Sequence, residues 1–225
     1  MKTSVIIPAY NEEKYIADCL KSLQNQTVKP DEILVIDNNS TDTTHTIAET
    51  FEGVTVLTET KQGITHARNR GLNTAQGDII IRTDADTTVP PDWVEHVIRL
   101  FNEHNVDAVT GDIVYPEKVL HTRFISASYR FMCRIIYGFD VLLGPNMAIK
   151  KSTWEKIRDT VCLNDKEVHE DVDISIHLDK SKGTIYYDKT LLVVTSSRRM
   201  IHNPYSLFVE YLIRMLKTYK KHYMS

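Results

Sequence analysis

"IIIRTDADTTVPPDW", residues 79–93, runs three isoleucines into the triplet Asp84-Ala85-Asp86 and then into a Pro-Pro-Asp-Trp segment. Two carboxylates this close repel each other unless a positive charge lies between them. One interpretation is a solvated turn, because Asp, Thr and Pro are common turn residues. The other is a site for a divalent cation, which prefers hard oxygen ligands. The triplet alone is too short to decide between them.

The chain on the N-terminal side of this triplet alternates between two kinds of segment. Apolar runs rich in β-branched residues predict buried strands at residues 3–7, 32–36, 54–57 and 78–82, and helical periodicity predicts helices at 13–26, 42–51 and 64–75. This alternation predicts an α/β fold, a parallel sheet covered by helices on both faces.

The predicted strands end in polar residues. Residues 8–12, 37–42 and 83–86 follow the first, second and fourth strands and carry many oxygen and amide groups. Parallel sheets bind ligands at the carboxyl ends of their strands. We therefore expect these three segments to lie along one edge of the sheet and to form a binding site there.

The second half of the chain is less regular but shows no linker. Helices are predicted at 91–103, 119–137 and 170–179, and strands at 108–115, 146–149 and 191–195. A length of 225 residues suits one large domain. The net charge of −3 disfavours general nucleic-acid binding.

The cysteines and the hydropathy pattern indicate the compartment. Three scattered cysteines support neither a disulfide framework nor a zinc site. The sequence has neither a signal-peptide core nor an apolar run of about 18 residues. We expect a cytoplasmic protein that is soluble or peripherally membrane-associated.

Several residues could carry chemistry. Asp84 and Asp86 suit Mg²⁺ or Mn²⁺ completed by substrate phosphates. In "KQGITHARNRG", residues 61–71, Arg68 and Arg70 suit either a solvated helix face or the binding of phosphate.

Six segments in this order resemble the family 2 glycosyltransferases: "VIIPAYNEE", "LVIDNNSTD", "GITHARNRG", "IIIRTDAD", "GPNMAIKK" and "HEDVD". The resemblance covers roughly residues 2–200. It implies inverting enzymes with nucleotide-sugar donors and the GT-A fold, a single Rossmann-like, mixed and mostly parallel sheet flanked by helices. Here residues 1–86 would be the nucleotide-binding half, residues 87–200 the acceptor-side half, and residues 201–225 a C-terminal helical extension.

The resemblance also implies roles for individual residues. Asp86 would bind the metal, Mg²⁺ or Mn²⁺, while Asp84 lies near ribose and sugar. The Asp171 carboxylate would be the catalytic base; a stabilising acid at a helix N-terminus is the alternative. The remaining residues implied to bind the nucleotide or donor are Pro8, Ala9, Tyr10, Glu12, Asp37, Arg68, Ala85, Gly144, Asn146 and Glu170.

The segment "SSRRMIHNP", residues 196–204, follows the last predicted strand. Arg198 and Arg199 are candidates for contact with the diphosphate, and His202 is a candidate metal ligand, because such late segments often fold over the diphosphate in GT-A enzymes. A solvated loop is the alternative for all three.

The sequence departs from the family pattern in two segments. Asn38 and Asn39 stand where an acid and a glycine are usual, although Asn tolerates the left-handed turn. The Q-x-x-R-W segment of processive synthases is missing, which favours a single-addition enzyme. We expect a hexosyl- or N-acetylhexosaminyl-transferase using a UDP-sugar, with GDP- and dTDP-sugars as alternatives, in surface polysaccharide or glycolipid synthesis. A sugar nucleotidyltransferase and an inactive sugar-nucleotide-binding module are the competing hypotheses.

Two helical segments suggest a possible membrane contact. Residues 121–139 interleave arginines with aromatic residues, and residues 204–225 form an amphipathic helix ending in lysines. Both helices could simply pack on the core. Alternatively, a basic aromatic face could lie on anionic lipid and serve a carbohydrate or lipid-linked acceptor.

Overall fold

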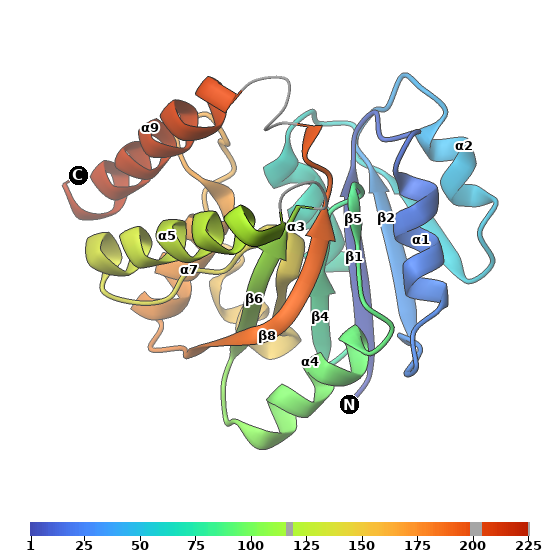
Figure 1. The fold of residues 1–225 in the computed structure, drawn as a ribbon, viewed down its shortest axis with the longest axis horizontal. Helices are drawn as coiled ribbons and strands as arrows, with labels where there is room; N and C mark the ends of the chain where they lie inside the picture. Colours follow the sequence, from blue (N-terminus) through green and yellow to red (C-terminus); the bar gives the residue numbers. More distant parts are fainter. Residues whose placement is uncertain (116–118, 199–203, 225) are drawn as a thin grey trace.

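The computed structural model describes residues 1–115, 119–198 and 204–224, and of residues 119–126 and 204–211 the backbone alone. Its centre is an eight-stranded sheet in the order β3-β2-β1-β4-β7-β6-β8-β5 (Figure 1). The strands are β1 Thr3–Ala9, β2 Glu32–Asp37, β3 Val54–Thr58, β4 Ile79–Arg82, β5 Thr87–Thr88, β6 Ala108–Val114, β7 Met147–Lys150 and β8 Ile185–Thr195.

The first four strands form the parallel half of the sheet. Strand β1 pairs in parallel with both β2 and β4, and β2 pairs in parallel with β3. Ala9 lies opposite Asp37, and Ile6 lies opposite Arg82. The polar segments after β1, β2 and β4 therefore leave the sheet at one edge, as the sequence predicted.

The second half of the sheet is mixed. Strand β7 is antiparallel to both β4 and β6, whereas β6 and β8 are parallel. The two-residue strand β5 directly follows the Asp-Ala-Asp triplet and pairs antiparallel with the end of β8, where Thr87 lies opposite Thr195. This pairing joins the triplet to the segment that carries Arg198.

Helices cover both faces of the sheet, and each face has its own apolar core. One core involves α1 Ile16–Gln24, α2 Thr44–Glu49 and α4 Trp93–Glu103; the other involves α3 Ile64–Thr74, α6 Lys151–Ile157 and α7 Glu170–Lys180. A short 3-10 helix, Gly144–Asn146, precedes β7.

A third, smaller apolar cluster joins α5 Val119–Tyr137, α7 and the C-terminal helix α9 Pro204–Tyr223. Met215 of α9 is fully buried there, and Tyr219 packs against the cluster. In Figure 1, α9 and α5 lie on the same side of the molecule, beyond β6 and β8. The part of the amphipathic stripe that carries these two residues therefore faces the core.

Strand β8 and helix α6 differ from the sequence prediction, and the two-residue strand β5 was not predicted. Strand β8 has eleven residues, because Ile185-Tyr-Tyr-Asp-Lys-Thr extends it before the apolar run predicted at 191–195. The polar residues Asp188 to Thr190 interrupt the apolar pattern near a register shift opposite Gly111 and Asp112. Helix α6 was missed because it has only seven residues and follows β7 without a turn; it buries Trp154 and Ile157.

All three cysteines are free thiols. Within the described ranges, no helix combines the length and the apolarity that crossing a membrane requires.

Candidate active site

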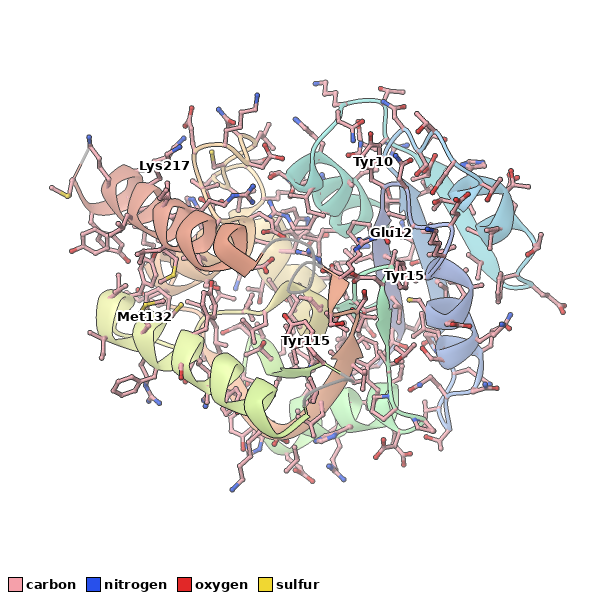
Figure 2. The ribbon with its side chains drawn as sticks, turned by 45° about the horizontal axis from the view of Figure 1, so that its top comes forward. Tyr10, Glu12, Tyr15, Tyr115, Met132 and Lys217 are labelled. Carbon is pink, nitrogen blue, oxygen red and sulfur yellow. The ribbon has the colours of Figure 1, made fainter. Side chains whose placement is uncertain are left out.

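The segment after β1 forms one side of the strand-end edge. Pro8 and Ala9 are buried at the end of the strand, and Tyr10 is about half exposed. Figure 2 shows Tyr10, Glu12 and Tyr15 together on the stretch between β1 and α1. The Glu12 main-chain N–H donates to the Thr44 hydroxyl at 2.7 Å, which ties this stretch to the start of α2.

Asp37 ends the neighbouring strand β2 with its side chain buried. One carboxylate oxygen accepts from the Ser40 main-chain N–H at 3.2 Å, and the other lies 3.2 Å from Nδ1 of His45. Asn39 takes a left-handed conformation, with φ of 58°. Asn39 therefore adopts the left-handed conformation that Asn tolerates, as expected from the sequence.

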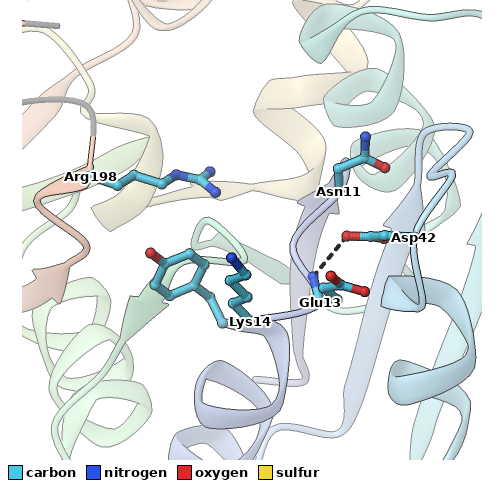
Figure 3. A pocket seen from close by; sticks show the side chains of 6 residues that line it. Asn11, Glu13, Lys14, Asp42 and Arg198 are labelled. Carbon is cyan, nitrogen blue, oxygen red and sulfur yellow. Dashed lines mark hydrogen bonds between the residues drawn. The ribbon is translucent and has the colours of Figure 1, made fainter. Parts of the chain in front are cut away.

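A shallow pocket of about 260 Å³ opens beside these loops. It is lined by Asn11, Glu13, Lys14, Tyr15, Asp42 and Arg198 (Figure 3). Two of these lining residues are joined by a hydrogen bond, in which the Asp42 carboxylate accepts the Glu13 main-chain N–H at 3.2 Å. The Arg198 guanidinium lies 5.1 Å from the centre of the Tyr15 ring. Arg198 thus reaches across from the chain after β8 to the segment after β1.

The Asp-Ala-Asp triplet separates its two acids. Ala85 is buried between them. Asp84 Oδ1 lies 3.1 Å from Nη2 of Arg82, whereas Asp86 Oδ2 lies 3.5 Å from Nε of Arg198. Arg198 also pairs with Glu12. The two carboxylates therefore have different cationic partners.

The thiol of Cys19 is buried near the acids of the strand-end edge. Burial raises the pKa of this thiol first, and the negative charges of Asp86, Asp84 and Glu12 raise it further. All three carboxylates thus lie close enough to Cys19 to act on it electrostatically. Carboxylate oxygens such as those of Asp84 and Asp86 suit Mg²⁺ or Mn²⁺ better than a softer metal.

Arg82 is the residue that sequence reasoning missed. Its side chain is only 2% exposed, and it contacts Asp84, Glu170 and Asp171. The distance is 2.9 Å from its Nη2 to Glu170 Oε1 and 2.8 Å from its Nη1 to Asp171 Oδ1. A usable signal was present, because an arginine inside a buried strand is almost never found without a charged partner.

Asp171 occupies the first turn of α7, where the positive end of the helix favours an acid. Its Oδ2 accepts the Gly144 main-chain N–H at 2.7 Å. No side chain fits at Gly144, since an added Cβ would lie 2.7 Å from Arg82 Nη2 and 2.8 Å from Asp171 Oδ2. The glycine therefore allows the loop to approach the acid closely.

The pKa values of the neighbouring acids Glu170 and Asp171 are shifted in opposite directions. Burial raises the pKa of Asp171 well above its usual range, the negative charge of Glu170 adds to this, and Arg82 opposes it. For Glu170, the effect of burial is outweighed by Arg82 and His169, which hold its pKa well below its usual range. The pair therefore combines one readily protonated carboxyl with one that stays ionised.

Two of the predicted donor-binding residues make hydrogen bonds inside the fold. Arg68 is fully buried, and its Nη1 donates to the Glu170 carbonyl at 2.7 Å, so it braces the start of α7 from inside. Asn146 is also fully buried: its Oδ1 accepts from Trp93 Nε1 at 2.9 Å, and its Nδ2 donates to the carbonyls of Asp112 and Leu191. Both side chains are held inside the fold by these hydrogen bonds, and the donor contact expected for them stays a prediction.

Two further predicted residues, Arg199 and His202, lie outside the described residues. In the part of the chain that is described, two groups bring ligand atoms within 4.8 Å of one another and could hold a metal ion. They are His169-Glu170-Asp171 and Asp173-His177-His222.

Comparisons with known proteins identify the family of the chain. The profile of glycosyl transferase family 2 matches residues 4–160. The probable glycosyltransferase YdaM of Bacillus subtilis is 31% identical over 197 residues, which cover 79% of this chain and 46% of YdaM. Glycosyltransferase GlyA of Streptococcus pneumoniae is 33% identical over 115 residues, 49% of this chain and 16% of GlyA. The chain thus spans less than half the length of these two relatives.

Solved structures show the same fold. The mannosyltransferase PcManGT from Pyrobaculum calidifontis, in complex with GDP-Man and Mn²⁺, has a TM-score of 0.74 at 23% identity, covering 95% of this chain and 62% of that one. Residues 1–349 of TarS from S. aureus have a TM-score of 0.66 at 21% identity, covering 96% and 66%. The mixed sheet with helices on both faces is the GT-A fold. The match to more than two thirds of the sequence, together with the fold, shows that the chain belongs to glycosyl transferase family 2.

Proposed function

We propose that this chain transfers a sugar from a nucleotide-diphosphate donor to an acceptor hydroxyl, with inversion at the anomeric carbon and one addition per binding event. The observation that carries this proposal is Arg82, which contacts both Asp84 of the triplet and Asp171 of α7. One guanidinium thereby brings a donor-side acid and a candidate base to the same place. Sugar transfer needs such a pair of sites side by side.

Asp171 is the proposed base. It removes the proton from the acceptor hydroxyl as that oxygen bonds to C1 from the face opposite the diphosphate. The C1–O bond to the diphosphate breaks, and the diphosphate leaves with the electron pair. The raised pKa of Asp171, caused first by its burial, makes it a stronger base than an ordinary aspartate.

Asp86 is the proposed protein ligand of Mg²⁺ or Mn²⁺, with Asp84 nearby. When bound, the metal would offset the negative charge that develops on the departing diphosphate. Arg198, which lies 3.5 Å from Asp86, is placed to contact the same diphosphate. This assignment is supported by the position of the triplet directly after β4, at the strand-end edge of the sheet, and by the Mn²⁺ in the PcManGT complex.

The donor is proposed to be a UDP-sugar carrying a hexose or an N-acetylhexosamine. Asp37 and Tyr10 would bind the nucleoside at the ends of β2 and β1. Structures similar in fold include TarS with UDP-GlcNAc and PcManGT with GDP-Man, which makes a GDP-sugar the main alternative.

The acceptor is proposed to be a carbohydrate or a lipid-linked sugar met at a cytoplasmic membrane face. Helices α5 and α9 expose large apolar side chains: Phe131, Ile135, Leu212, Ile213 and Leu216. Figure 2 places Met132 of α5 and Lys217 of α9 on this side of the molecule. Apolar side chains beside lysines suit contact with anionic lipid.

This surface has a direct test. Replacing Phe131 and Ile135 with serine should reduce co-sedimentation with phosphatidylserine-containing liposomes, because it removes exposed apolar area. Ser substitution at Val28, an exposed apolar residue elsewhere, is the matched control. Equal binding of all three proteins would contradict the membrane contact.

The competing functions fit less well. A nucleotidyltransferase would be expected to carry a glycine- and lysine- or arginine-rich phosphate loop after the first strand, whereas residues 8–13 here read Pro-Ala-Tyr-Asn-Glu-Glu. An inactive binding module would not need the buried pair of Glu170 and Asp171 held against Arg82.

The proposal is tested by thermal-shift screening against nucleotide-sugars with and without Mn²⁺, followed by transfer assays. We expect metal-dependent stabilisation by one nucleotide-sugar. Asp171→Asn should keep that stabilisation and lose transfer, whereas Asp86→Ala should lose the metal dependence. Transfer by Asp171→Asn at the wild-type rate would exclude Asp171 as the base.

A further inference from the structure

A second group of titratable side chains lies where α7, beyond Asp171, meets α9. We call Asp173, His177 and His222 the tail site. Asp173 and His177 are four residues apart on α7, so they lie on one face of the helix. His222 comes from the last turn of α9. Asp173 Oδ1 lies 2.8 Å from Nε2 of His222 and 3.7 Å from Nε2 of His177.

The tail site is enclosed. The Asp173 side chain is fully buried, and those of His222 and His177 are 7% and 15% exposed. One oxygen of Asp173 accepts the Cys162 main-chain N–H at 2.8 Å, which leaves the other directed at the two imidazoles. Burial lowers the pKa of His177. A lower pKa favours the neutral imidazole, which is the form that offers a nitrogen lone pair.

These three ligand atoms match the preferences of zinc. Zinc binds imidazole nitrogen and carboxylate oxygen at about 2.0–2.2 Å, which places the ligand atoms of a tetrahedral site about 3.4 Å apart. The distances of 2.8 and 3.7 Å lie on either side of that value. Mg²⁺ prefers oxygen ligands alone, so this site differs in chemistry from the Asp84–Asp86 triplet.

Two lysines lie near the tail site. Lys180 Nζ is 3.4 Å from Nδ1 of His222 and 3.3 Å from the His222 carbonyl, and Lys221 Nζ is 3.1 Å from Cys162 Sγ. Lys180 is exposed, so it can keep the carbonyl contact while the proton of His222 moves to Nδ1. Nε2 is then available to a metal, as in other imidazole ligands whose second nitrogen is protonated.

We propose that Asp173, His177 and His222 bind one Zn²⁺, with water completing the coordination, and that this ion clamps the C-terminal helix to α7. The same two helices already meet where the Thr218 hydroxyl accepts the His169 main-chain N–H at 2.7 Å. The ion would thus fix α9 on the helix that begins with Glu170. This proposal does not depend on the sugar transfer proposed above.

Zinc binding by the full chain provides the test. The protein is treated with EDTA and dialysed against Zn²⁺ in the presence of excess Mg²⁺, and bound zinc is measured by mass spectrometry of the metal. We expect His177→Gln and His222→Gln each to bind one equivalent less than the wild type. His104→Gln is the matched control, since His104 stacks on Tyr186 at 4.0 Å and is not part of the tail site.

A second measurement covers the case in which a variant folds poorly. Co²⁺ added to the folded wild type should give the visible absorption of a tetrahedral site, and excess Zn²⁺ should abolish it. Circular dichroism identifies any variant that has lost its fold. Equal zinc content in the wild type and both folded histidine variants, or no tetrahedral Co²⁺ spectrum, would overturn the proposal and leave a hydrogen-bonded helix contact.

Discussion

The most informative perturbation is Arg82→Met, which removes one buried guanidinium and keeps the apolar volume. Arg82 lies 3.1, 2.9 and 2.8 Å from oxygens of Asp84, Glu170 and Asp171. Removing one partner of a buried ion pair costs about 3–5 kcal/mol, because the remaining charges lose their compensation. For a chain of this length, such a loss lowers the melting temperature by about 6–20 °C.

The pH dependence of this loss follows from Glu170. Its folded-state pKa is lowered, with Arg82 the strongest of the groups that overcome burial. Such a group adds stability above its unfolded-state pKa, and that stability disappears as the pH falls through its folded-state pKa. The difference between wild type and Arg82→Met should therefore be largest at neutral pH and should shrink as the pH falls below about 4.3, the pKa of a free Glu.

Urea unfolding at several pH values measures this difference. The matched control is Arg99→Met, which removes an exposed arginine 4.0 Å from Glu103 and should change the unfolding free energy by about 0–1 kcal/mol. A loss in Arg82→Met no larger than in this control at neutral pH would refute the role assigned to Arg82.

Three further predictions concern the residues around this arginine. Glu170→Gln should move the acid limb of kcat/KM to lower pH, because after burial the charge of Glu170 is the main cause of the raised pKa of Asp171; a limb that stays in place or moves upward contradicts this. Gly144→Ala should lower kcat by about 10²-fold, since the added Cβ displaces Arg82 or Asp171. Steady-state kinetics would measure this loss, and an unchanged melting temperature would show that the variant is folded. Trp93→Phe should cost about 1–3 kcal/mol in urea unfolding, because Asn146 Oδ1 loses its buried donor; an unchanged unfolding midpoint would show that this bond is dispensable.

The parallel half of the fold could be predicted because its strands are nearly continuous apolar runs. The predictions for β1 to β4 agree with the structure to within two residues at each end. The polar residues that follow them could be assigned to one edge from topology alone. The short strand β5 could not be predicted, because two threonines carry no periodic signal. They form a strand only by pairing with the end of β8, which is distant in the sequence.

The individual roles of site residues depend on burial, which the sequence does not display. Arg68 and Arg82 look alike as arginines near polar strand ends. In the fold, the Arg68 side chain donates to a main-chain carbonyl, whereas Arg82 contacts three carboxyl groups. The side-chain amide of Asn146 similarly hydrogen-bonds to Trp93 and to two main-chain carbonyls. Such assignments need the positions of partners that lie far away in the sequence.

The central claim is inverting transfer with Asp171 as the base, and the anomeric configuration of the first product tests it most directly. Proton NMR can follow donor hydrolysis, in which water takes the place of the acceptor, and record the released sugar before it mutarotates. From an α-linked nucleotide-sugar, the wild type should release the β-anomer first, and Asp171→Asn should release almost none. Initial release of the α-anomer, or wild-type release by Asp171→Asn, would contradict the account.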